Sequence, residues 1–414
     1  MNLAVSLALK HLLTRKRQTL VSLAGVAMGV GFFIAMMALM RGMQQHFIVK
    51  VINAWPHVIV KDEYREVPRQ PAEIAYAGAA VMLHGVKPRD ELRGIRDAKA
   101  AIAQLSQLPG LEAAPTLRGQ VFLRYGTREV SATLVGIDPQ RERRVTNIER
   151  DLLSGKLDDL HTAANGIILG DGLAKKIGAG MGNSLTATSP AGAVLKVEVV
   201  GIFATGVTAI DFFESYMLLK KAQVLQARPN VINQIRIRLD DVERAGERAA
   251  EIERWIGYKS ESWQEAYSNV FGIFKIQNGV MYTSVGAILI VAAFGIFNII
   301  STVVHEKSRD IAIMKSIGLY ESDIRRIFLI EGLIIGIAGT LLGWVLGYAL
   351  IEVLASIRME IIGFIKAQGF ILYRGYASYF IAAAFALIAS TFAAWWPARR
   401  AARLRPVDII RGAA

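Results

Sequence analysis

The hydrophobic residues of the chain are concentrated in four long segments, one near the N-terminus and three in the C-terminal part. The segments are residues 19–40, 280–304, 332–351 and 377–396, and none of them contains Lys, Arg, Asp or Glu. Each reaches the roughly 20 residues that a helix needs to cross the hydrocarbon core of a bilayer. The pattern therefore predicts four transmembrane helices, at residues 18–41, 276–304, 327–355 and 377–397.

Between the first two hydrophobic segments, from residue 42 to 274, the chain is polar and mixed in pattern. Strand-like alternation occurs at 58–60, 120–123, 129–137, 195–203 and 233–239, and helical periodicity at 95–108 and 242–255. The tract 66–86 is predicted to be a surface loop. The predicted fold class is a membrane α-helical protein with four transmembrane helices and a large extracytoplasmic α+β domain inserted between helices 1 and 2.

The basic residues, 48 Lys and Arg against 35 Asp and Glu, give a net charge of +13 and are unevenly placed. They cluster beside the hydrophobic segments, in residues 1–17, 305–326 and 398–414, which favours lipid headgroups over nucleic acid. By the positive-inside rule these three parts are cytoplasmic, and the 42–274 domain and the 356–376 loop are extracytoplasmic. Leucines at i,i+4 spacing predict an amphipathic helix within the first part.

The cytoplasmic loop at residues 305–326 has the pattern of a short amphipathic helix. Its apolar residues fall on one arc of a helix, Gly318 is placed to end it, and Arg309, Lys315 and Ser316 occupy the opposite side. The arc consists of Ile311, Ile313, Met314 and Ile317. From periodicity alone two interpretations remain open: the helix lies on lipid, or it docks on a cytoplasmic partner.

Glycine is frequent in the third hydrophobic segment and lets helix backbones approach closely where lipid provides no hydrophobic drive between helices. The glycines predicted to pack against other helices are Gly25, Gly29, Gly332, Gly336, Gly339, Gly343 and Gly347. This packing is either within one chain or between the subunits of a dimer. Glu331, near the start of the third predicted helix, is expected to interact with the helix dipole or with solvent.

Residues that could carry chemistry are sparse. The chain has no cysteine, no Gly-x-x-x-x-Gly-Lys-Ser/Thr phosphate loop and no visible pairing of a nucleophile with a base. We therefore predict no catalytic residue, no metal ligand and no cofactor-binding residue in this chain, and we do not expect it to be an enzyme.

Several stretches, at residues 306–318, 328–332 and 397–411 together with the glycine-rich third helix, carry a resemblance to a known family. They resemble the permease subunits of ABC transporters in the lipoprotein-releasing (LolC- and LolE-like), macrolide-exporter (MacB-like) and cell-division (FtsX-like) superfamily. Residues 201–206 followed by 216–219 are similar to the lipoprotein-releasing branch in particular. As an ensemble these motifs are specific, although no single one of them would suffice.

The resemblance implies a bacterial inner-membrane permease that pairs with a second copy or a paralogue. A separate cytoplasmic ATPase dimer would hold the ATP and Mg. The permease would contact this ATPase through a coupling helix that contains Arg309, Asp310, Ile311, Ile313, Met314, Lys315, Ile317 and Gly318. Arg309 and Lys315 would lie at the polar rim of the contact. ATP-driven closure would be transmitted to the periplasmic domain, a process termed mechanotransmission, to extract or release lipoproteins or another amphiphilic cargo.

The chain departs from the carrier-recruiting member of the lipoprotein-releasing pair at residues 187–194, where a short turn replaces a longer Pro-rich loop. Binding of a periplasmic carrier or adaptor is therefore left open, as are the cargo and the choice between homodimer and heterodimer. The alternative function is an FtsX-like relay that regulates an envelope hydrolase without transporting cargo. That branch usually has a much smaller outer domain.

Overall fold

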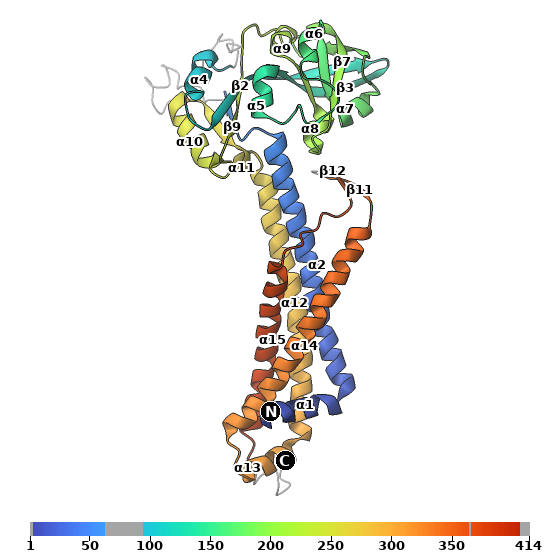
Figure 1. Ribbon diagram of the computed structural model, residues 1–414, viewed down its shortest axis with the longest axis vertical. Coiled ribbons are helices and arrows are strands. Elements are labelled where there is room, and N and C mark those ends of the chain that lie inside the picture. The colour runs from blue at the N-terminus through green and yellow to red at the C-terminus, as the bar shows by residue number, and fades with distance from the viewer. Residues whose placement is uncertain (1–2, 63–93, 364–365, 406–414) are drawn as a thin grey trace, which may run out of the picture. The chain divides into compact units, whose positions relative to one another are not determined.

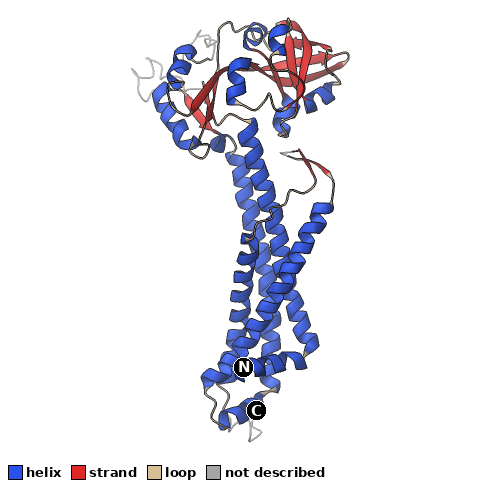
Figure 2. Ribbon diagram, in the orientation of Figure 1, coloured by secondary structure: helices blue, strands red, loops and turns tan. Residues whose placement is uncertain are grey.

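The computed structural model describes residues 3–62, 94–363 and 366–405. The chain divides into two compact units: unit 1 comprises Met1–His46, Gly272–Glu360 and Ala367–Ala414, and unit 2 comprises Phe47–Phe271 and Ile361–Lys366. Figure 1 labels the elements of both units, and Figure 2 shows the helices of unit 1 and the strands of unit 2 in separate colours. The predicted loop at 66–86 lies outside the described residues.

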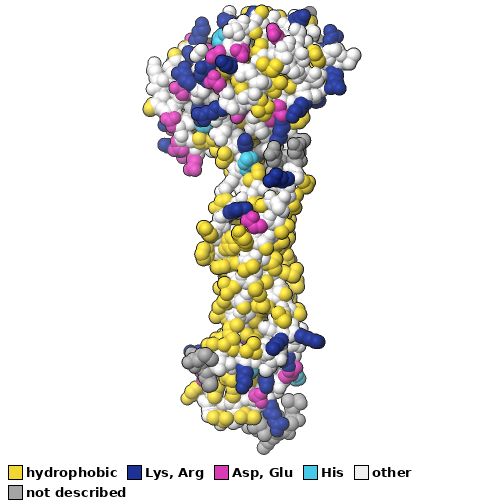
Figure 3. Space-filling model, turned by 45° about the vertical axis from the view of Figure 1, so that its right-hand side comes forward, with side chains coloured by type: hydrophobic (Ala, Val, Ile, Leu, Met, Phe, Trp, Pro, Cys, Tyr) yellow, Lys and Arg dark blue, Asp and Glu magenta, His cyan; other side chains and the backbone are white. Residues whose placement is uncertain are grey.

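Unit 1 is helical. Its elements are α1 (Leu3–Thr14), α2 (Lys16–Ala54), α12 (Ser268–Glu306), α13 (Ser308–Ser316), α14 (Glu321–Ser356) and α15 (Ala377–Ala402), and α2 and α12 both extend into unit 2. In the part of the chain that the structure describes, α2, α12, α14 and α15 are long and apolar enough to cross a membrane. Figure 3 shows hydrophobic side chains along much of this unit, with Lys and Arg near the end that carries α13.

The helix α2 runs past the predicted end of the first transmembrane segment at residue 41. Its last turns carry Phe47 and Val51, both buried, at i,i+4 spacing. Because this apolar pair packs into unit 2, the helix continues beyond the hydrophobic segment, and unit 2 begins at Phe47 rather than at residue 42.

The loop at 356–376 also differs from a plain connection, since it contains two paired strands, β11 (Glu360–Ile362) and β12 (Lys366–Gln368).

The glycines of α14 pack against two neighbouring helices of the same chain. A Cβ atom added at Gly339 would lie 2.7 Å from Val26 Cβ, and one at Gly343 would lie 2.5 Å from Val30 Cβ, both on α2. A side chain at Gly347 would likewise meet Ile34 of α2. These contacts are far closer than side chains tolerate, so only glycine permits this approach of α14 to α2.

The remaining predicted glycines also face helices of the same chain. Gly332 and Gly336 of α14 lie against Ala394 and Ser390 of α15, and Gly25 and Gly29 of α2 lie against α12. All seven predicted glycines therefore pack against helices of the same chain, which is one of the two alternatives that the sequence analysis left open. A role of these glycines in a dimer stays a prediction.

Unit 2 is built on one mixed sheet of ten strands. The strands are β1 (Val58–Lys61), β2 (Leu111–Tyr125), β3 (Arg128–Ile137), β4 (Leu152–Gly155), β5 (Gly166–Gly170), β6 (Ser184–Thr188), β7 (Val194–Phe203), β8 (Glu214–Leu218), β9 (Gln234–Leu239) and β10 (Lys259–Ser262). Their order is β10-β1-β9-β2-β3-β8-β5-β7-β4, and β6 pairs with β2 and β7. The tight connection from β6 to β7 confirms the short turn predicted at 187–194, where Thr188 lies opposite Val194.

Short helices flank this sheet. They are α4 (Ala98–Leu105), α5 (Pro139–Val145), α6 (Asp159–Thr162), α7 (Asp171–Ile177), α8 (Thr208–Phe213), α9 (Leu219–Leu225), α10 (Ala245–Ile256) and α11 (Trp263–Ala266). The long strand β2 joins the two halves of the sheet, because Leu111–Thr116 pairs with β9 and Leu117–Tyr125 pairs with β3. The sheet is therefore continuous from β10 to β4.

Buried ion pairs connect the elements around the middle of the sheet. Arg236 of β9 donates to Glu142 of α5 at 2.8 Å, and both side chains are almost fully buried. Arg118 of β2 pairs with Glu214 of β8 at 2.9 Å, and the Tyr216 hydroxyl donates to Glu214 at 3.0 Å. Burial and the neighbouring Glu214 carboxylate raise the pKa of Tyr216 well above its usual value. The hydroxyl therefore remains a donor to Glu214 at neutral pH.

We expect Gly343→Leu to destabilise the monomeric chain by about 1–3 kcal/mol, because the leucine would force α14 away from Val30. Gly286→Leu on α12 is the matched control, since a Cβ atom there has no neighbour within 4 Å in the described part of the chain. Thermal unfolding of the monomer fraction in detergent measures both effects. Equal stability of the two variants would contradict the packing described for α14.

Candidate ATPase-docking site

The helix α13 lies in the short connection between α12 and α14, and its inner side is held by the core of unit 1. Ile311 and Ala312 are both 0% exposed, and Ile311 belongs to the same hydrophobic cluster as Ile324 and Ala401. Gly318 follows the last helical turn with φ 112°, a backbone conformation that favours glycine. The predicted helix terminator is thereby confirmed.

The outer side of α13 presents apolar residues to solvent. Ile313 is 47% exposed, and Ile317 and Tyr320 are each 77% exposed. The predicted apolar arc is therefore divided, because Ile311 faces the core and Met314 packs partly against it. A nine-residue helix that touches a core on one side cannot offer its whole apolar arc to a partner. The exposed apolar residues that remain are Ile313 of α13, Ile317 at the C-cap of α13 and Tyr320 at the N-cap of α14, and we call these three residues the α13 ridge.

The polar residues of α13 are placed differently from one another. Arg309 and Asp310 are exposed, and Asp310 pairs with Lys307 at 2.8 Å. Lys315 is only 13% exposed and donates to the carbonyl oxygens of Ala402 at 2.8 Å and Leu404 at 2.9 Å. The position of Lys315 at the rim of a docking surface stays a prediction, and most of this side chain is covered by its own chain. The Lys315 ammonium satisfies free carbonyls at the end of α15.

A basic cavity opens beside this end of α15. It has a volume of about 530 Å³ and is lined by Trp396, Arg399, Arg400, Arg403 and Leu404. Within the described ranges none of the three arginines forms an ion pair with the chain. Arg400 and Leu404 also line a second cavity, of about 210 Å³, together with His305 and Ser308. A positively charged surface therefore borders the N-terminal end of α13.

Glu331 does not occupy the position expected for it. The helix α14 begins at Glu321, so Glu331 lies several turns inside it, and its carboxylate is buried under α1. The nearest basic group is His11 of α1, whose Nδ1 atom lies 3.8 Å from a Glu331 oxygen. The interpretation of Glu331 as a dipole partner or a solvated residue is wrong, because packing of α1 across α14 excludes solvent from this position.

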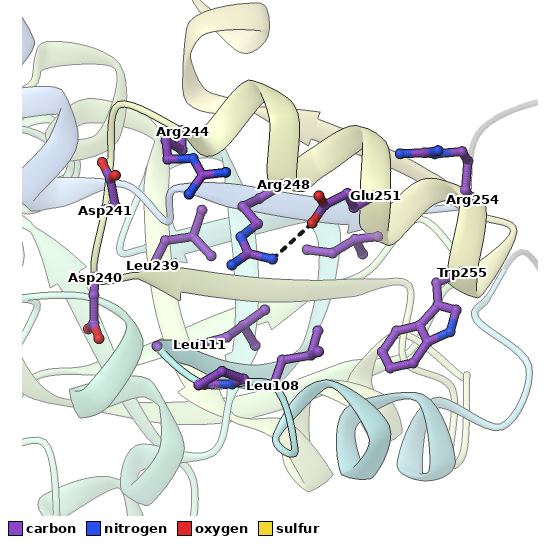
Figure 4. Close-up of a pocket in the computed structure, with 13 residues that line it drawn as sticks. Leu108, Leu111, Leu239, Asp240, Asp241, Arg244, Arg248, Glu251, Arg254 and Trp255 are labelled. Atoms are coloured by element: carbon purple, nitrogen blue, oxygen red, sulfur yellow. Dashed lines mark hydrogen bonds and ion pairs between the residues drawn. The ribbon is translucent and has the colours of Figure 1, made fainter.

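Unit 2 contains a groove that was not predicted from the sequence. It has a volume of about 410 Å³ and is lined by residues of the β2 start, the β9 end and α10. Figure 4 shows an apolar floor of Leu108, Leu111 and Leu239, with Trp255 at one end and an Arg248–Glu251 pair above. That pair is 2.9 Å apart. The groove combines an apolar floor with charged residues, of which Arg248 and Glu251 partly neutralise one another.

Four helices long and apolar enough to cross a membrane, with a mixed α/β domain inserted between the first and the second, are the architecture of a polytopic membrane protein. A family model described as MacB-like periplasmic core domain matches residues 19–255, and one described as FtsX-like permease C-terminal matches residues 282–406. The chain therefore belongs to the family of ABC transporter permeases that these two domains define.

Relatives agree with this assignment along most of the chain. The lipoprotein-releasing system transmembrane protein LolC of Neisseria meningitidis serogroup B is 29% identical, covering 83% of this chain and 81% of that protein. LolC of Xylella fastidiosa is 26% identical, covering 99% of this chain and 98% of that protein. The macrolide export ATP-binding/permease protein MacB of a Shewanella species is 24% identical, covering 98% of this chain and 60% of that protein.

Solved structures of outer domains are also similar to this chain. The periplasmic region of MacB from Actinobacillus actinomycetemcomitans aligns with 51% of this chain and 91% of its own length, at 14% identity and a TM-score of 0.32.

Two isoleucines, Ile311 in α13 and Ile317 at its C-cap, allow a test of the orientation of this helix. Ile311→Ala should destabilise the chain by about 2–5 kcal/mol because it opens a cavity in the core of unit 1. Ile317→Ala should change stability by less than about 0.5 kcal/mol because that side chain is exposed. Thermal unfolding of each purified variant gives both values, and a larger loss for Ile317→Ala would show that α13 is rotated.

Proposed function

We propose that this chain is the membrane subunit of an ABC transporter and that it couples ATP hydrolysis in a separate cytoplasmic ATPase dimer to movement of unit 2. The observation that carries the proposal is the α13 ridge. Because Ile311 and Lys315 tie α13 to the chain's own core and to α15, force on the ridge displaces several helices together.

The separation of the ATPase from this chain is supported by the sequence. No phosphate-loop motif occurs in the 414 residues of this chain, and the relatives named LolC are transmembrane proteins of a lipoprotein-releasing system. ATP and its Mg would accordingly be held by the partner. Two permease subunits, identical or paralogous, would face the two subunits of an ATPase dimer.

The cargo class that we propose is a lipoprotein or a similar amphiphile of the bacterial inner membrane. It is supported by relatives named for lipoprotein release and by the mixed groove of unit 2, which offers apolar and charged surface side by side. In this mechanism the cargo is moved by unit 2 at the periplasmic face rather than passed through a channel between the helices.

The proposed orientation can be tested directly because the chain has no cysteine. Ser131→Cys, at an exposed position of β3, should react with a membrane-impermeant maleimide in intact spheroplasts. Lys307→Cys, beside α13, should react only after lysis, since the positive-inside rule places it in the cytoplasm. The reverse pattern of labelling would contradict the orientation.

Ile317→Asp should abolish binding of the ATPase while the chain still inserts and remains stable. An unpaired carboxylate buried in a docking groove costs several kcal/mol, enough to lose a contact of micromolar affinity. Leu13→Asp, at an exposed apolar residue of α1, is the matched control and should retain binding. The measurements are co-purification of the ATPase and ATP hydrolysis in nanodiscs. Wild-type values for Ile317→Asp would mean that α13 rests on lipid.

A further inference from the structure

The loop between α14 and α15 contributes a segment to unit 2. Residues Ile361–Lys366 belong to unit 2, although the chain on either side of them belongs to unit 1. The backbone N–H of Lys366 donates to the carbonyl of Gly206 at 2.8 Å, and the Thr208 hydroxyl donates to the carbonyl of Gly363 at 2.6 Å. These bonds fix the loop to the connection between β7 and α8.

The side chain of Lys366 enters an acidic site formed by two aspartates. Its ammonium lies 3.0 Å from an oxygen of Asp211, forms an ion pair with Asp171 and lies 5.0 Å from the centre of the Phe212 ring. Burial alone would lower the pKa of Lys366, but the hydrogen bonds to Asp171 and Asp211 raise it, so the ammonium stays charged.

Asp211 is the fixed part of this site. It is 0% exposed, and it accepts hydrogen bonds from the backbone N–H and the hydroxyl of Thr205, both at 2.8 Å, and from the N–H of Gly206 at 3.1 Å. Gly206 has φ 81°, which favours glycine. Thr205 and Gly206 are the last two residues of the 201–206 motif, which was noted above for its similarity to the lipoprotein-releasing branch. That motif thus shapes the Asp211 site, which we call the Lys366 socket.

We infer that the Lys366 socket is an internal transmission contact through which the α14–α15 loop moves unit 2. The inference rests on the proposed function. The loop is covalently continuous with both helices, so displacement of either helix end pulls on Lys366. Withdrawal of the Lys366 ammonium would leave the buried Asp211 carboxylate without its cation, which is unfavourable. The part of unit 2 that contains Asp211 therefore moves together with the loop. Lys366 is accordingly a positioning residue.

The test uses the full chain with its ATPase in nanodiscs and measures hydrogen–deuterium exchange of residues 201–213, with and without vanadate-trapped nucleotide. In the wild type we expect exchange in this segment to change when nucleotide is trapped. Lys366→Met should lose that change while ATPase binding and basal hydrolysis stay at wild-type levels, and Lys366→Arg should retain it. Lys175→Met is the matched control, because Lys175 also pairs with Asp171 but is 80% exposed and lies outside the loop.

A nucleotide-dependent change that persists in Lys366→Met would overturn the inference. Exchange in Lys366→Met could also rise equally with and without trapped nucleotide, leaving the difference between the two states unchanged. The ion pair would then have only a structural role, and this result would overturn the inference too. Thr208→Val, which removes the bond to Gly363 without altering charge, should weaken the change and serves if Lys366→Met is poorly folded. Failure of the proposed function would show in the wild type itself. The wild-type chain would then bind the ATPase, but trapped nucleotide would not change hydrogen–deuterium exchange in residues 201–213.

Discussion

The close approach of α14 to α2 and α15 is the constraint on which the membrane unit depends. In lipid, apolar side chains gain little by leaving the bilayer for another helix, so association relies on tight packing and on hydrogen bonds. Glycines along α14 allow its backbone to lie against Val26, Val30 and the small residues of α15. The helix α13 is held by the same cluster, since Ile311 packs with residues of α14 and α15. The candidate docking surface thus depends on glycines far from it in the sequence.

The buried carboxylates of the two units differ in the partners that surround them. In unit 2, Glu142, Glu214 and Asp211 each meet a cation and further donors, as burial of a carboxylate requires. In unit 1, both oxygens of Glu331 lack a hydrogen-bond partner among the residues that the structure describes, and His11 is 3.8 Å away. The carboxylates of unit 2 therefore hold elements together, whereas Glu331 marks the position at which α1 crosses α14.

Much of the architecture could be predicted because it depends on local pattern. Hydrophobic length indicated all four long helices, and period-two alternation indicated β1, β3, β7 and β9. The strand β5 was missed because its residues are buried on both faces, which removes the alternation. The extension of α2 into unit 2 was missed because Phe47 and Val51 acquire a partner only in the folded chain.

The class of the protein could be predicted from the amino-acid sequence, since long uncharged segments, basic flanks and a set of family motifs are all properties of contiguous residues. Which side of α13 is exposed, in contrast, depends on contacts between distant parts of the folded chain. Ile311 and Ile317 are the same residue type on one predicted arc, yet one is buried and the other is exposed. Lys315 and Lys366 likewise resemble surface lysines in the sequence. Their acceptors, the end of α15 and two aspartates of unit 2, are distant along the chain, and folding alone brings them within hydrogen-bonding distance.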